Sequence, residues 1–346
     1  MNRRRPIHVT SSQNKFNLSR MAALWSTYQS DTLALCVFEY FLAKNQDPDT
    51  ASILRLSQEK SEQHIDFISS IFKEEHIPIP FGFSKEKDVF PDAPAIYGDT
   101  FFLMYLRQMA KVGMITYSGA VSLTVREDIL DFFQQALRFS SDLYKKATET
   151  GKEKGVLIRP PYIDYPEKVE FIKEKSYMSS SLNPFVNRRP LNAIEISHLF
   201  LNTETNLLGS MIATSFAQMA QSKEVRKFMS RTQEIAQKHL NIFSDALINN
   251  DMQAPMSWDT NVKASTVPAF SDKLMMFHTT LISNAGMGNY GTAAAASMRA
   301  DLVSNYFRLI LEVAELGKSG ADILINNGWL EEPPQSADRK KLAEDK

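Results

Sequence analysis

The stretch EKSEQHIDFISSIFKEEHIPIP, from Glu59 to Pro80, decides the fold, because a second version of it, EIAQKHLNIFSDALINNDMQAP, occupies residues 234–255. His64 in the first stretch matches His239 in the second, 175 residues later, and the flanking glutamates and prolines match at the same offset. A constant offset between similar segments indicates a duplicated structural unit. The sequence therefore predicts two copies of one unit within a single chain.

Matches continue towards the end of each copy at an offset of 173 residues, so a deletion of two residues separates the two blocks. The later matches are Asp99/Asp272, Gly113/Gly286, Tyr117/Tyr290, Arg126/Arg299, Asp128/Asp301 and Gly155/Gly328. Because the repetition extends so far, we expect the two copies to share one fold along their whole length.

Each copy contains four segments with helical periodicity. In residues 18–44, apolar side chains recur at steps of three, four or seven, which is the pattern of an amphipathic helix. The other segments of the first copy are expected at about 48–76, 100–121 and 127–150, the last opened by a capping box of Thr124 and Glu127. In the second copy they are expected near 192–221, 223–249, 272–292 and 298–326.

Connections of short, long and short length join the four helices of each copy. The long connections, residues 77–98 and 252–270, are rich in proline and lack helical periodicity. A four-helix bundle with one long crossover is the ferritin-like arrangement. The sequence thus predicts an all-α protein of two tandem ferritin-like four-helix bundles, each with its crossover between the second and third helices. The expected domains are residues 14–154 and 190–334, with a linker at 155–189 and a polar tail at 335–346.

Composition excludes several classes of function. The 346 residues include 39 basic and 40 acidic side chains, and this net charge of -1 argues against nucleic-acid binding. Residues 274–298 carry no formal charge, but their counterpart contains Arg107 and Lys111, so we expect buried helices and no membrane span. The single cysteine, Cys36, and the lack of a recognisable signal peptide favour a reducing, cytoplasmic location.

Several motifs stand out: RPPYI in the first copy, and RPLNAIEISHLF, FSDKLMMFH, GNYG and NGWLEEPP in the second. Together they resemble an uncharacterised family of ferritin-like proteins from endospore-forming bacilli. Members of that family carry one bundle or two in tandem and are loosely associated with coat-type spore proteins. The resemblance implies the fold and a place in the sporulating cell or within the spore, and it implies no established activity.

The expected fold raises the question of a di-iron centre, which needs a Glu from each of two helices and a Glu-x-x-His from each of the other two. Glu195 and His198 form the single Glu-x-x-His match of the second copy, and the first copy has none, with Ala23 at the position of His198. We therefore predict no metal or cofactor site and no catalytic residue. If a metal were bound, iron, manganese or zinc would be the candidates.

The repeated histidines point inward on the expected helix faces. Their depth along the bundles places His64 with Gln29 and Tyr117, and His239 with Glu204 and Tyr290. We expect a buried polar layer in each bundle that satisfies its own hydrogen bonds and fixes the helix register. The alternative is a small ligand or single-metal pocket, better supported in the second bundle because Glu204 replaces Gln29.

Three hypotheses of function follow from these patterns. The first is a non-catalytic structural or interaction protein, associated with sporulation or the spore coat, that has lost the metal site. The second is a metal-dependent oxidoreductase or metal-binding protein with an irregular site near Glu204 and His239, and the third is a module that binds a small apolar ligand. For partners we expect other proteins or self-association, with the two bundles packed face to face as an internal pseudo-dimer. Cleavage of the linker near Ser180 would then not separate the halves.

Overall fold

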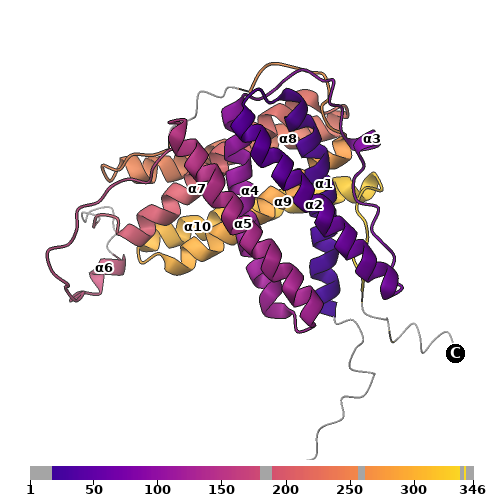
Figure 1. Ribbon diagram of the computed structural model, residues 1–346. Coiled ribbons are helices and arrows are strands. Elements are labelled where there is room, and N and C mark those ends of the chain that lie inside the picture. Colours follow the sequence, from indigo (N-terminus) through magenta and orange to yellow (C-terminus); the bar gives the residue numbers. More distant parts are fainter. Residues whose placement is uncertain (1–17, 180–188, 256–261, 336–338, 340–346) are drawn as a thin grey trace, which may run out of the picture.

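A computed structural model describes residues 18–179, 189–255, 262–335 and 339, and within these ranges the protein contains helices and no β-strand (Figure 1). The helices are α1 Leu18–Lys44, α2 Pro48–Glu74, α3 Lys85–Asp88, α4 Asp99–Leu123, α5 Glu127–Glu153, α6 Ser176–Ser179, α7 Ala193–Met219, α8 Lys223–Ile248, α9 Asp272–Ala296 and α10 Ala300–Asn326. The predicted all-α fold with two tandem four-helix bundles is confirmed.

The two bundles have the same plan. Helices α1, α2, α4 and α5 pack together as the first bundle, and α7, α8, α9 and α10 pack as the second. In each bundle a short turn joins the first two helices and another joins the last two, while a long crossover links the pairs. The bundles lie against each other with α4 and α9 towards the centre of the molecule (Figure 1).

Side-chain caps explain where α2, α7, α8 and α9 begin. Asp47 caps α2 by accepting a hydrogen bond from the Thr50 amide at 3.2 Å, directly before Pro48 at the first helical position. The predicted capping box of Thr124 and Glu127 is wrong. Thr124 ends α4 and donates its hydroxyl to the Ala120 carbonyl at 2.8 Å, so its side chain is not available to α5.

One hydrophobic core extends through both bundles at their contact. Its buried members come from all four helices of each bundle and from both crossovers. They include Cys36, Tyr40, Ile53, Phe101, Phe102, Val225, Met229, Leu274, Met275 and Met276. Each bundle has a smaller core of its own at the end that points away from this contact. The long crossovers are therefore held by burial at the shared core.

The contact between the bundles follows an approximate two-fold axis. Tyr105 Oη lies 2.7 Å from His278 Nε2, and these residues are 173 apart and occupy equivalent positions. The crossovers pair in the same way, because the Phe90 amide donates to the Ala269 carbonyl at 2.8 Å and the equivalent Lys263 amide donates to the Ile96 carbonyl at 2.9 Å. Such reciprocal contacts are the mark of an isologous interface.

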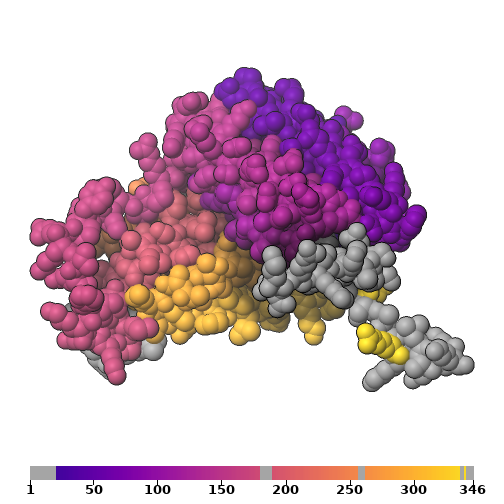
Figure 2. Space-filling view, turned by 60° about the horizontal axis from the view of Figure 1, so that its bottom comes forward, coloured from indigo at the N-terminus to yellow at the C-terminus, as the bar shows by residue number. Residues whose placement is uncertain are grey.

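The linker lies outside both bundles. It projects at one side of the molecule and carries exposed side chains such as Tyr165 and Phe171 (Figures 1 and 2). Ser180, the position considered for cleavage, and most of the tail at 335–346 lie outside the described residues. The domain limits of 14–154 and 190–334 stay predictions. None of the helices in the described ranges has the length and apolar character needed to cross a bilayer.

Candidate functional site

In the first bundle, His64 hydrogen-bonds a carboxylate that the sequence pattern did not point to. His64 Nδ1 lies 3.1 Å from Asp31 Oδ2, and the Ser61 hydroxyl donates to Asp31 Oδ1 at 2.8 Å. The Tyr117 ring stands edge-on to the imidazole with centroids 6.1 Å apart. Gln29 is buried, but the residue that bonds His64 is Asp31, two positions further along α1. In the first bundle, His64 is therefore paired with a carboxylate of its own bundle, which Ser61 also bonds.

In the second bundle, His239 belongs to a longer chain of hydrogen bonds. His239 Nδ1 lies 3.0 Å from Tyr290 Oη, so these two predicted residues do meet. The Asn206 amide donates to Tyr290 Oη at 2.8 Å, and His239 Nε2 lies 3.1 Å from Glu312 Oε2. Lys238 donates to Glu312 at 2.8 Å at the surface end. The chain runs from the partly exposed Glu312 to the buried Asn206.

Burial and hydrogen bonding set the protonation states of Glu312, His239 and Tyr290 in this hydrogen-bond chain. Burial lowers the pKa of His239, and the hydrogen bond to Glu312 offsets this only in part, so the imidazole is neutral near pH 7. Burial alone raises the pKa of Glu312, but hydrogen bonds from Lys238 and His239 outweigh it, and the pKa is lowered overall. Burial raises the pKa of Tyr290, which therefore keeps its proton.

Glu204 does not belong to the His239 layer in which we expected it. Its carboxylate turns to α4 of the first bundle, where Arg107 Nη1 lies 3.1 Å from Oε1 and Lys111 Nζ lies 2.9 Å from Oε2. Arg107 also donates to Tyr144 Oη at 3.2 Å. The expectation failed because it counted depth along one bundle, whereas the direction of the Glu204 side chain is set by the other bundle.

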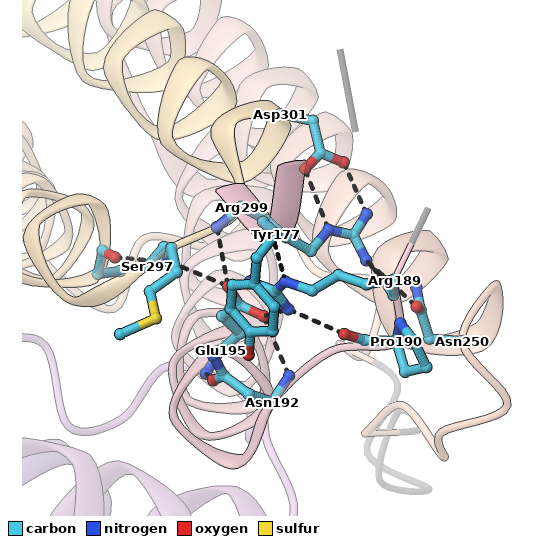
Figure 3. Close-up of polar contacts among 11 residues, drawn as sticks. Tyr177, Arg189, Pro190, Asn192, Glu195, Asn250, Ser297, Arg299 and Asp301 are labelled. Carbon is cyan, nitrogen blue, oxygen red and sulfur yellow. Dashed lines mark hydrogen bonds and ion pairs between the residues drawn. The ribbon is translucent and has the colours of Figure 1, made fainter. Parts of the chain in front are cut away.

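Glu195, the first residue of the Glu-x-x-His match, is a structural carboxylate (Figure 3). It accepts hydrogen bonds from both terminal nitrogens of Arg189 at 2.9 and 2.7 Å, and from the Arg299 amide at 2.9 Å. It also forms a capping box with Asn192 at the start of α7. Burial raises the pKa of Glu195, but these hydrogen bonds outweigh it and lower the pKa overall. Burial lowers the pKa of His198, which is half-buried.

The same cluster fixes the start of the fourth helix in each bundle. Arg299 Nη2 lies 2.7 Å from Asp301 Oδ2, and the equivalent Arg126 Nε lies 2.8 Å from Asp128 Oδ1. Arg299 also donates to Asn250 Oδ1 at 3.2 Å (Figure 3). Among the described residues, no group of three or more His, Cys, Asp and Glu side chains is arranged to hold a metal ion.

A cavity of about 70 Å³ lies at the inner end of the His239 chain. All four helices of the second bundle line it, and α4 of the first bundle closes one side. The apolar lining includes Met109, Val112, Leu208, Ile212, Ile235, Ile282, Val313 and Leu316. The polar lining includes Gln108, Thr205, Asn206, Thr232, His239, Ser283 and Tyr290. The cavity thus has an apolar body and a polar end.

Sequence reasoning missed Asp31, Asn206 and Glu312. Asp31 and Asn206 are related by the offset of 175 residues, so a search for repeated polar positions could have found them. Glu312 has no such signal because Phe139 stands at its equivalent position. The cavity itself depends on helix spacing, which no sequence pattern reports.

Comparisons with known proteins place the chain among proteins of unknown function. A family described as "Protein of unknown function (DUF3231)" matches it twice, over residues 7–169 and 179–342. A crystal structure from Bacillus halodurans, provisionally described as a spore coat protein, is similar at 14% identity and a TM-score of 0.41, covering 45% of this chain and 100% of that chain. At this level the likeness carries no conclusion about function. No curated protein matches the chain.

Proposed function

Because the chain belongs to the DUF3231 family, whose function is unknown, we propose a function from its own geometry. The protein is a binding module that holds a small, mostly apolar molecule in the core of its second bundle. The first bundle acts as a scaffold that closes one side of this cavity through α4. The single observation that carries the proposal is the cavity of about 70 Å³ with its polar end at Tyr290 and Asn206.

The first bundle supports this proposal by contrast. A Cβ atom added at Gly113 would stand 2.5 Å from Ser140 Oγ, so α4 and α5 are in close contact there. A Cβ atom added at the equivalent Gly286, which lines the cavity, would meet nothing within 4 Å. The space beside the equivalent glycine is therefore open in the second bundle and filled in the first.

The size of the cavity limits the ligand. An apolar cavity of about 150 Å³ takes up benzene, so about half that volume holds roughly three heavy atoms. Because the cavity is open on one side, a chain of about five heavy atoms can extend partly out of it. The best very small ligands gain up to about 1.5 kcal/mol per heavy atom, which sets the tightest dissociation constant of such a molecule in the micromolar range. Titrations should therefore extend to millimolar concentrations.

Methyl NMR of the full chain, labelled at the isoleucine δ1 methyl groups, tests the proposal. Ile212, Ile235 and Ile282 line the cavity, whereas Ile68 and Ile129 lie in the core of the first bundle and serve as internal controls. Titration with 1-butanol or diethyl ether should shift the first set saturably and leave the second unchanged. Failure of both probes to shift the cavity methyls would overturn the proposal.

Filling the cavity supplies the matched control. The Gly286→Leu variant should lose the response to both probes, because its side chain occupies the cavity. Gly288→Leu, on an exposed position of the same helix with open space around it, should keep the response. If Gly286→Leu still responds to the probes while the first-bundle methyls stay unshifted, the probes bind outside the cavity.

A metal-dependent oxidoreductase has less support than a binding module. Glu204 is paired with Arg107 and Lys111, and Glu195 is paired with Arg189, so neither carboxylate is free to join His239 or His198. A metal ligand set would have to break these ion pairs, and breaking a buried pair costs about 3–5 kcal/mol.

A structural role is the second candidate, favoured by the reciprocal contacts around the two-fold axis. We infer that the bundles form an internal pseudo-dimer, because Tyr105 meets its equivalent His278 and the two crossovers pair reciprocally. The spore association that the family resemblance implies stays a prediction. Immunoblots of purified spore fractions and of vegetative cells test it, and a protein confined to vegetative cells would contradict it.

A further inference from the structure

The polar end of the cavity has a defined pattern of donors and acceptors. The Glu312 carboxylate can only accept a hydrogen bond, so the facing Nε2 of His239 carries the proton. A neutral imidazole has one N–H group, and therefore Nδ1 is an acceptor, 3.0 Å from Tyr290 Oη. The Tyr290 hydroxyl has a second acceptor at 3.0 Å, the Oδ1 atom of Asn206, and its single proton serves one of the two.

The Asn206 amide group is committed in the same way. Its Nδ2 atom donates to the Asn202 carbonyl at 2.8 Å and to Tyr290 Oη at 2.8 Å, which uses both of its hydrogens. Tyr290 has one proton for two acceptors, His239 Nδ1 and Asn206 Oδ1, so one of them is left without a donor. A molecule that enters here satisfies it only if it brings a hydrogen-bond donor.

Charge sets a second condition on the ligand. Among the residues that line the cavity there is no lysine, arginine or carboxylate, and the nearest charge along the hydrogen-bond chain is the Glu312 carboxylate behind His239. A ligand carboxylate at the polar end would meet the acceptors of Asn206 and His239, and it would find no cation in the lining to offset its loss of hydration. A ligand ammonium would be surrounded by an apolar lining without a carboxylate in contact. Either ion is disfavoured against a neutral group.

We propose that the ligand of the second bundle is a neutral small alcohol, whose hydroxyl donates to the acceptor that Tyr290 leaves without a proton, Asn206 or His239, while its apolar chain packs against Ile282 and Leu316. This rests on the proposed function and names the chemical class of its ligand. The apolar chain belongs on the side of α9 and α10 because Ile282, Val313 and Leu316 form that wall. The chain of Glu312, His239 and Tyr290 acts as a positioning device that keeps the acceptors facing the cavity.

A comparison of two isomers tests the chemical class of the ligand separately from the question of whether the cavity binds a molecule. 1-Butanol and diethyl ether have the same composition, but only the alcohol can donate a hydrogen bond. A net hydrogen bond corresponds to roughly three- to tenfold in affinity, so 1-butanol should bind roughly fivefold more tightly than the ether in the methyl NMR titration. Butyrate, with the same chain and a carboxylate, should leave the cavity methyls unshifted up to the same concentrations.

The outcomes distinguish this inference from the function on which it rests. Equal or tighter binding of the ether, or binding of butyrate, would overturn the alcohol assignment and leave the binding cavity supported. No shift with any probe would overturn both. In the bound state, nuclear Overhauser effects should connect the terminal methyl of 1-butanol to the Ile282 methyl and its hydroxyl-bearing carbon to the Tyr290 ring. The opposite orientation would also contradict the inference.

Discussion

The two bundles differ most where they are expected to be most alike, around the repeated histidine. His64 is hydrogen-bonded to Asp31, which also accepts from Ser61 of the same bundle, and the space beside Gly113 is filled by Ser140. His239 instead connects a surface carboxylate to the buried Tyr290 at the edge of a cavity. Duplication thus preserved the helix framework and the imidazole, while a few substitutions changed the histidine's partners and the space beside it.

A second difference lies in the charges that hold the bundles together. Glu204 is buried, with a side-chain exposure of 4%, and it forms ion pairs with Arg107 and Lys111 across the contact. The equivalent positions on the other side of the axis are the neutral Gln29, Thr280 and Asn284. The contact therefore carries its ion pairs on one side of the axis only.

The largest effect is expected from removing that charge. Glu204→Gln gives the position the residue type of its counterpart and leaves two cations without their carboxylate, which should lower the free energy of unfolding by about 3–5 kcal/mol. Urea unfolding followed by circular dichroism measures the change. The control is Gln29→Ala, which removes no charge. A loss in Glu204→Gln no larger than in this control would show that the ion pairs do not stabilise the contact.

The pH dependence of stability tests a further asymmetry on the axis. Burial lowers the pKa of His278 from 6.5 to about 4, whereas Tyr105 occupies the equivalent position. Because the folded state resists protonation, His278 contributes full stability above about pH 6.5 and loses it as the pH falls towards 4, by about 3 kcal/mol. The variant His278→Phe should show a flatter profile than the wild type between pH 6.5 and 4. Identical profiles would contradict the assignment.

The smallest effect comes from the paired glycines, and it should have opposite signs. Gly113→Ala pushes a methyl group against Ser140 and should cost about 1–3 kcal/mol. Gly286→Ala adds a methyl group to open space on a helix and should raise stability by about 0.5–1 kcal/mol. Denaturant midpoints of the two variants measure this. Shifts of the same sign would mean that the bundles do not differ in packing at this level.

The architecture could be predicted from sequence because its signals are local and repeated. Apolar periodicity located eight long helices, and α1 begins and ends where the pattern indicated. The capping box at Thr124 failed because its hydroxyl had a nearer acceptor one turn back, in Ala120. Local patterns do not decide between this carbonyl acceptor and the backbone amide that a capping box would bring to the hydroxyl.

The candidate site was only partly predictable. The inward-facing His239 and Tyr290 could be inferred from their repetition, and they are hydrogen-bonded in the structure. Glu204 was grouped with them by depth alone, and depth does not specify the rotation of one bundle against another. Glu312 has no polar counterpart in the first bundle, so the repeat could not identify it. Partner choice is a tertiary property, so it required the coordinates.

The contact of Tyr105 with His278 shows what joining two copies in one chain makes available. In a dimer of identical subunits, a residue on the symmetry axis faces itself, so its partner must be the same side chain. Tandem fusion lifts that restriction, because each copy can mutate alone. The Tyr105 phenol can then face the His278 imidazole at 2.7 Å. A symmetric homodimer cannot form this pairing of two different side chains at this position.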